Sequence, residues 1–128
     1  MNAKTYLLEL FPKTIHYKLA RRGIVDPANP VTLTFSVTAA CQSRCKTCHI
    51  GTRYHADPQI AKQDLTLDEI EKIFQSLGHV YFLNISGGEP FLRPDLPQII
   101  QLACKYLTPA IVHIPTNALT PQRIARAT

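Results

Sequence analysis

The sequence lacks long hydrophobic runs, a recognisable signal peptide, heptads and low-complexity tracts. Its longest apolar runs, such as residues 80–85, are far shorter than the roughly 20 residues of a transmembrane helix, which excludes a membrane-spanning class. Only 18% of the residues are charged, yet 45% are hydrophobic, an ordinary share for a folded core, so the composition excludes a disordered chain. A length of 128 residues fits one domain.

Positive charge is in modest excess, since 14 basic residues against 9 acidic ones give a net charge of +5. Such an excess can serve a nucleic acid or an anionic membrane surface. Here the basic residues are scattered along the chain, which is typical of a solvated, mildly basic surface. We therefore expect no nucleic-acid partner.

The sequence has only four cysteines, and three of them lie within eight positions. Cys41, Cys45 and Cys48 fall in the segment CQSRCKTCHIG (residues 41–51), whereas Cys104 stands alone downstream. Without a signal peptide a reducing setting is expected, and we predict a cytoplasmic protein. In that setting clustered cysteines bind metal or do redox chemistry more often than they form disulfides.

Residues 1–30 are predicted to form a helical leader and a linker. Apolar residues recur at helical spacing over residues 5–22, and Pro12 should kink this helix or divide it into two. Gly23 is a typical helix stop, and residues 26–30 (DPANP) are rich in helix breakers. A basic amphipathic helix can lie on a membrane surface, but these charges are not confined to one face, which favours a leader packed across the end of the domain.

From residue 31 onwards, strand and helix patterns alternate. Strands are predicted at residues 31–38, 80–85 and 110–115, and the second, nearly all apolar, should be covered on both faces. The repeated β-loop-α order predicts a parallel sheet. The first connection is an enlarged loop, to about residue 63, and it holds the three clustered cysteines.

The helices of this alternating region are marked by capping residues. Thr66 and Glu69 form a capping box at the start of the first helix. Asp95 and Gln98 can cap the second, and Thr120-Pro121 should begin the third, with proline at the first helical position.

Three chemically distinctive segments follow the three predicted strands. They are CQSRCKTC (residues 41–48), SGGEP (residues 86–90) and PTN (residues 115–117). In barrels and open α/β sheets alike, ligands gather at the carboxyl ends of parallel strands. We therefore predict one site built from all three segments.

Three clustered thiols are compatible with several kinds of site. Structural zinc prefers four ligands, and His49 as the fourth would have to converge with its neighbour Cys48 on one small ion, which is awkward. Cys45 and Cys48 have the spacing of a dithiol redox pair, but that leaves Cys41 unexplained. An iron–sulfur cubane normally takes four cysteines. With three, one iron stays open for an outside ligand, as a catalytic metal site requires.

The C-x3-C-x2-C spacing after the first predicted strand resembles the signature of the radical S-adenosylmethionine (radical SAM) superfamily. SGGEP resembles the family's second signature, and residues 91–96 (FLRPDL) and 114–117 (IPTN) are also similar to family members. The resemblance covers residues 31–128. It implies an α/β fold: the N-terminal portion, about three βα units, of a partial parallel (β/α) TIM-like barrel, preceded by the leader helix.

The resemblance also implies the cofactors. Cys41, Cys45 and Cys48 would ligate three irons of a [4Fe–4S] cluster, and S-adenosylmethionine (SAM) would chelate the fourth. An electron donor such as a flavodoxin or ferredoxin would reduce the cluster, and cleavage of SAM would release a 5′-deoxyadenosyl radical that takes hydrogen from a small-molecule or peptide substrate. The resemblance implies that four residues line the methionine end of SAM and contact its ammonium: Gly87, Gly88, Glu89 and Pro90. Thr47 and Asn117 are the two other SAM-binding residues that it implies.

Two positions depart from the family pattern. The family often has an aromatic residue near the adenine just before the third cysteine, where this sequence has Thr47. The side-chain contact with the adenine should therefore be weaker, and a contact from the backbone of Thr47 is expected in its place. The family's Thr-Asn-Gly is Thr116-Asn117-Ala118 here, so this turn should differ in detail.

Several reactive residues have a structural interpretation instead. Cys104 is expected to be a small core residue. His113 is expected to be packed or hydrogen-bonded, with the alternative that it faces a substrate from the interior of a barrel. Arg53, Tyr54 and His55 follow the cysteines closely enough to touch a substrate, but no role is assigned to them.

Three βα units are fewer than the six of the family's partial barrel. We therefore expect the N-terminal portion of a longer enzyme, with little turnover by itself. Two other functions stay open from the residues alone: a non-catalytic iron–sulfur electron-transfer module, and a zinc-bound interaction module.

Overall fold

The computed structural model describes residues 3–127, which fall into two compact units, one ending at residue 30 and the other beginning at residue 31. No helix in this described range is both long and apolar enough to cross a membrane.

The first unit consists of α1 (Ala3–Ala20) and the linker after it. Pro12 lies inside this one helix, so the predicted alternative of two short helices is wrong. Gly23 does end the helix: its φ of 70° is left-handed, and its N–H donates to the Ala20 carbonyl oxygen at 2.9 Å. The Ile24 N–H bonds the carbonyl oxygen of Leu19 at 3.1 Å, which completes a Schellman motif.

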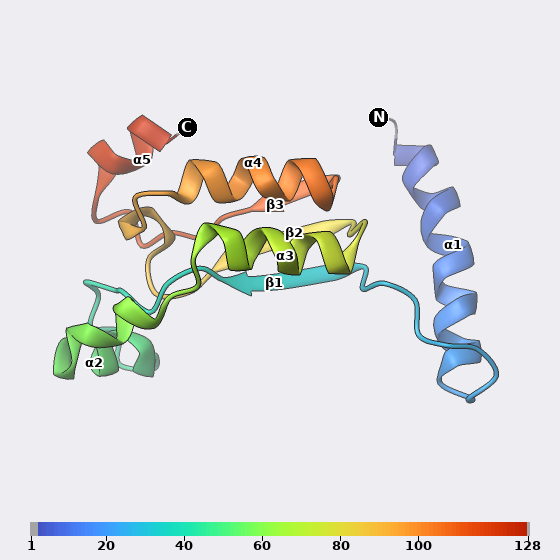
Figure 1. Cartoon of the computed structure of the whole chain (residues 1–128), viewed down its shortest axis with the longest axis horizontal. Helices are drawn as coiled ribbons and strands as arrows, with labels where there is room; N and C mark the ends of the chain where they lie inside the picture. Colours follow the sequence, from blue (N-terminus) through green and yellow to red (C-terminus); the bar gives the residue numbers. More distant parts are fainter. Residues whose placement is uncertain (1–2, 128) are drawn as a thin grey trace. The chain divides into compact units, whose positions relative to one another are not determined.

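The second unit holds, among the described residues, a three-stranded parallel sheet in the order β1-β2-β3 (Figure 1). The predicted fold class, a parallel sheet with alternating helices, is therefore confirmed. In chain order the elements are β1 (Thr32–Ser36), α2 (His49–Ala56), the 3₁₀ helix η1 (Pro58–Gln63), α3 (Leu67–Leu77), β2 (Phe82–Ser86), the 3₁₀ helix η2 (Pro90–Leu92), α4 (Leu96–Tyr106), β3 (Ile111–His113) and α5 (Pro121–Ala127).

One face of the sheet forms the core with α3 and α4. Leu83 and Ile85 of β2 are fully buried there, and Phe35 of β1 meets Phe74 of α3 edge-on with ring centroids 5.0 Å apart. The alternate residues of each strand are less buried. The expectation that residues 80–85 are covered on both faces is therefore wrong, because within the described chain the helices bury only one face of β2.

The helix caps agree with the sequence in part. Thr66 and Glu69 form the predicted capping box, and the hydrogen bonds from Thr66 lower the pKa of Glu69. Asp95 precedes α4, but its side chain makes no capping bond because Arg93 binds its carboxylate instead. Pro121 begins α5 as expected.

The connection that follows β1 is more ordered than expected. Residues 49–63, predicted as loop, contain α2 and η1. Asp57 caps the start of η1, since its side chain accepts a hydrogen bond from the Gln59 N–H at 3.0 Å.

Candidate functional site

The carboxyl ends of the three strands lie at one end of the sheet, and the three distinctive segments leave them there. Figure 1 shows α2, which follows the cysteines, and α5, which follows β3, at the end toward which the β1 arrow points. This is the arrangement that the sequence predicts for a shared site.

The SGGEP segment is hydrogen-bonded to the entrance of the cysteine loop. The Gly88 N–H donates to the Thr38 carbonyl oxygen at 2.7 Å, and the Glu89 N–H donates to the Ala40 carbonyl oxygen at 2.7 Å. Because these bonds extend the pairing of β1 with β2, the backbone that leads into Cys41 is fixed against the backbone that follows β2.

The two glycines of SGGEP permit this close approach. A Cβ on Gly88 would lie 2.1 Å from the carbonyl oxygen of Ala40 and 2.9 Å from the Cβ of Cys41. Gly87 has a φ of +136°, and a Cβ there would lie 2.5 Å from the carbonyl oxygen of Thr38. What the glycines accommodate in this structure is thus the cysteine loop itself.

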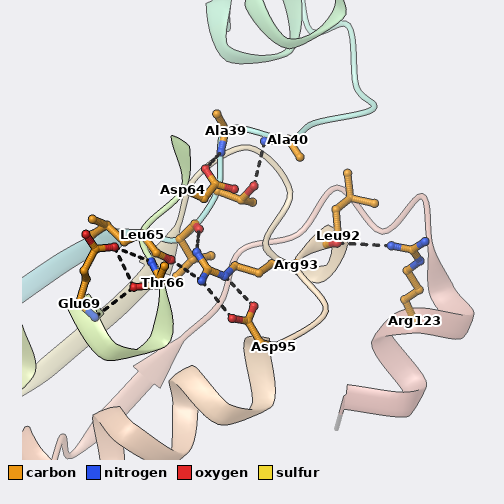
Figure 2. A network of polar contacts seen from close by, with 12 residues as sticks. Ala39, Ala40, Asp64, Leu65, Thr66, Glu69, Leu92, Arg93, Asp95 and Arg123 are labelled. Carbon is orange, nitrogen blue, oxygen red and sulfur yellow. Dashed lines mark hydrogen bonds and ion pairs between the residues drawn. The ribbon is translucent and has the colours of Figure 1, made fainter. Parts of the chain in front are cut away.

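Asp64 supports the same loop from the connection before α3. Its Oδ1 accepts a hydrogen bond from the Ala39 N–H at 2.9 Å, as Figure 2 shows. The Ala40 N–H is bonded to the hydroxyl of Thr38 at 3.0 Å. Consecutive backbone groups just before Cys41 are therefore paired, which limits the conformations of this segment.

Arg93 joins three segments beneath the site (Figure 2). Its guanidinium donates to the carbonyl oxygens of Val37, just after β1, and Leu65, just before α3. It also forms an ion pair with Asp95 at 2.7 Å, and its side chain is only 7% exposed. The hydrogen bonds from Arg93 lower the pKa of Asp95.

Replacing Arg93 with lysine is expected to loosen the cysteine loop. A single ammonium cannot reproduce the planar fork that reaches two carbonyl oxygens and a carboxylate at once. We expect a loss of about 2 kcal/mol in the free energy of unfolding, measured by urea denaturation, and faster proteolysis of residues 37–48. Arg126→Lys, at an exposed position of α5, is the matched control. Equal stability of the two variants would contradict this role of Arg93.

Glu89 connects the ends of β2 and β3. Its side chain is 1% exposed, and Oε1 accepts hydrogen bonds from the Thr116 hydroxyl at 2.9 Å and the Phe91 N–H at 3.2 Å. Oε2 accepts a third bond, from the Asn117 N–H at 2.7 Å. The carboxylate therefore holds the turn after β3 against the segment after β2.

The three clustered cysteines differ in burial. Cys41 is buried, while Cys45 and Cys48 are exposed, and all three are free thiols. The Cys48 N–H bonds the Cys45 carbonyl oxygen at 3.3 Å, so the C-x-x-C pair forms a turn immediately before α2. Gly51 of α2 packs against this loop, since a Cβ there would lie 2.1 Å from the Ser43 carbonyl oxygen.

The thiols share a short loop but do not converge. Among the described residues, no three side chains of His, Cys, Asp or Glu are gathered closely enough to hold a metal ion. Thr47 is exposed between the second and third cysteine, and His49 is the first residue of α2. Metal ligation by the trio remains a prediction, and it requires Cys45 and Cys48 to turn toward Cys41.

The other reactive residues lie around this loop or away from it. His113 is hydrogen-bonded to Asn84 at 2.8 Å, as one interpretation expected. Cys104 is exposed, so its predicted place in the core is wrong.

Arg53 lines a cavity of about 360 Å³ beside the loop. The cavity is lined by residues that include Ser36, Thr38, Ile50, Asp64 and Gly87.

The sequence did not single out Gln42, Gly51, Asp64 or Arg93. FLRPDL was noted only as a resemblance, yet its arginine, Arg93, stands between η2 and α4 and is buried against distant carbonyl oxygens. For Asp64 the available signal was its position two residues before a capping threonine.

Comparisons with known proteins agree with this arrangement. The model of the Radical SAM superfamily matches residues 35–127. The chain is 44% identical over 77 residues to a GTP 3′,8-cyclase of Aquifex aeolicus, covering 57% of this chain and 23% of that protein. It is 43% identical over 72 residues to a GTP 3′,8-cyclase of Tolumonas auensis, covering 54% and 20%.

A relative with a different name matches the same chain. Mycofactocin maturase MftC of Mycobacterium ulcerans is 32% identical over 76 residues, covering 58% of this chain and 19% of that protein. The chain spans about a fifth of the length of these relatives. Because the family model covers most of the sequence, including the cysteine loop and SGGEP, this chain belongs to the radical SAM superfamily.

Proposed function

We propose that this chain forms the cluster-binding part of a radical SAM enzyme. Cys41, Cys45 and Cys48 would hold a [4Fe–4S] cluster and leave one iron open for SAM. The observation that carries the proposal is the C-x3-C-x2-C loop of free thiols at the carboxyl end of β1, hydrogen-bonded along its entrance to SGGEP.

The residues present fit such a cluster. Cysteine thiolates are the ligands that iron–sulfur clusters use, and the absence of a Cβ at Gly88 lets the backbone just before Cys41 lie directly against SGGEP. Cys45 and Cys48 are exposed and sit in a turn, so their side chains can rotate, and metal binding supplies free energy to organise ligands. When bound, the cluster and SAM would supply one-electron cleavage of the cofactor to a 5′-deoxyadenosyl radical.

The chain's own residues would position this chemistry. Glu89, Thr116 and Asn117 keep the segments after β2 and β3 together. Asp64 and Arg93 tie the start of the cysteine loop to the segments before α3 and α4. Backbone carbonyl groups of Gly87 and Gly88 suit the SAM ammonium. A flavodoxin or ferredoxin would deliver the electron. Hydrogen abstraction from a small molecule or a peptide would follow in the complete active site.

Anaerobic reconstitution with iron and sulfide tests the proposal. We expect about four irons per chain, an electron paramagnetic resonance (EPR) signal after reduction, and a change of that signal on addition of SAM. Cys41→Ser, Cys45→Ser and Cys48→Ser should each lose the cluster, whereas Cys104→Ser, at an exposed position away from the loop, should keep it.

Two outcomes would contradict the proposal and favour the alternatives. A cluster whose EPR spectrum ignores SAM would indicate an electron-transfer module. A colourless protein with one bound zinc would indicate an interaction module.

A further inference from the structure

Gln42, the residue after Cys41, is held from two sides. Its backbone carbonyl oxygen contacts Nε2 of His55 in α2 at 3.3 Å. Its side-chain Nε2 donates to Oδ1 of Asn117, in the turn after β3, at 3.3 Å. The side chain therefore spans from the cysteine loop to the neighbouring segment of the site.

The orientation of the Gln42 amide follows from its partner. Oδ1 of Asn117 also accepts a hydrogen bond from the N–H of Leu119 at 3.0 Å, and an amide nitrogen in that place cannot accept one. Because Asn117 presents an oxygen, Gln42 must present its NH₂ group to it. The carbonyl oxygen Oε1 of Gln42 is thereby directed elsewhere.

This oxygen is buried and lacks a partner. Oε1 of Gln42 is one of two buried side-chain polar atoms without a hydrogen bond in the described part of the chain. The other is the hydroxyl oxygen of Thr120, whose hydrogen can rotate toward an acceptor. A carbonyl oxygen has no such freedom, and a buried acceptor without a donor is unfavourable.

The location of Gln42 indicates what would satisfy it. Its backbone is continuous with the buried Cys41, and Asn117 joins it to the buried carboxylate of Glu89. Glu89, Asn117 and Gln42 thus form one chain of hydrogen bonds across the three segments that surround the site. An acceptor at the end of this chain is positioned by the site's own framework.

We propose that Oε1 of Gln42 accepts a hydrogen bond from an N–H or O–H group of the SAM bound beside Cys41. This inference rests on the proposed function. SAM carries such donors at both ends: an ammonium on its methionine part, and ribose hydroxyls and an amino group on its adenosine part. Gln42 is then a binding residue that distinguishes a ligand with a donor at this point from one without it.

Gln42→Met tests the proposal, because methionine has a similar length and no hydrogen-bonding carbonyl. The full chain with its reconstituted cluster is titrated with SAM, methionine and 5′-deoxyadenosine, and binding is followed by calorimetry and by the EPR change. We expect an unchanged iron content and about tenfold weaker SAM binding. Affinity should fall for whichever fragment donates the hydrogen bond, methionine or 5′-deoxyadenosine, and stay the same for the other. Gln101→Met, at an exposed position of α4, should bind all three probes as the wild type does.

Thermal unfolding without ligand separates a binding role from a structural one. Gln42→Met removes the unpaired buried acceptor and also the 3.3 Å hydrogen bond to Asn117, whose Oδ1 keeps the Leu119 N–H. Because these two effects oppose each other, the melting temperature should stay close to that of the wild type. A melting temperature lowered by several degrees, or unchanged SAM affinity in this variant, would overturn the role of Gln42. Wild-type protein that carries the cluster but binds none of the three probes would instead contradict the proposed function.

Discussion

Replacing Gly88 with alanine is expected to abolish cluster assembly and to destabilise the second unit by about 3 kcal/mol or more. The new Cβ would lie 2.1 Å from the Ala40 carbonyl oxygen, a contact with backbone that no rotamer change can relieve. The cysteine loop would have to move away, and the Gly88–Thr38 and Glu89–Ala40 hydrogen bonds would break. Iron content after reconstitution and urea denaturation followed by circular dichroism measure the two effects.

Gly23→Ala is the matched control for this substitution. A Cβ on Gly23 would meet no atom within 4 Å, but its φ of 70° is unfavourable for alanine. We expect a local loss of about 1 kcal/mol at the end of α1 and normal cluster loading. If Gly88→Ala loaded iron as well as Gly23→Ala does, the close approach between SGGEP and the cysteine loop would not be needed for cluster binding.

The glycines show how far the sequence could predict this site. Two adjacent glycines at a strand end indicate that something approaches the backbone closely. From the sequence, the group that approaches the glycines was predicted to be a ligand. In the structure, the carbonyl oxygens of Thr38 and Ala40 lie so close that a Cβ on either glycine would clash with them. A glycine pattern reports the need for space and not the identity of the group that fills it.

The alternation of strands and helices and the capping box of α3 were predictable because their signals are local. The capping box of Thr66 and Glu69 lies within four residues, and the alternating β and α patterns define a parallel sheet. Arg93 had no such signal, since Val37 lies 56 residues away in the sequence. Contacts of this length become visible only when the strands are assembled.

Other predictions failed for reasons of geometry. Cys104 was assigned to the buried side of its helix, but the buried residues of α4 are Leu96, Ile99 and Ala103. One position after Ala103, the helix has turned by about 100°, which carries Cys104 off that stripe. The short helix α2 was missed because eight residues that begin with His49 contain little apolar periodicity.

Replacing Glu89 with glutamine is expected to have the second large effect. The carboxylate of Glu89 accepts from Phe91 and Thr116 on one oxygen and from Asn117 on the other. A glutamine has one oxygen, so in either orientation its NH₂ group faces a backbone N–H, and two donors oppose each other. We expect a loss of about 2–4 kcal/mol in the free energy of unfolding, because the site is buried and each unpaired donor is unfavourable.

Glu71→Gln provides the control for the Glu89 variant, because Glu71 is a surface carboxylate of α3 that pairs with Lys105 and Tyr106. Its urea midpoint should stay close to that of the wild type, since surface pairs contribute little. The affinity for SAM, measured while both variants are folded, distinguishes the effect of Glu89 on the geometry of the site from its effect on stability. Release of Asn117 also frees Gln42, so below the unfolding transition Glu89→Gln should bind SAM more weakly than Glu71→Gln. Equal urea midpoints and equal SAM affinities of the two variants would mean that the turn after β3 holds its position without the carboxylate.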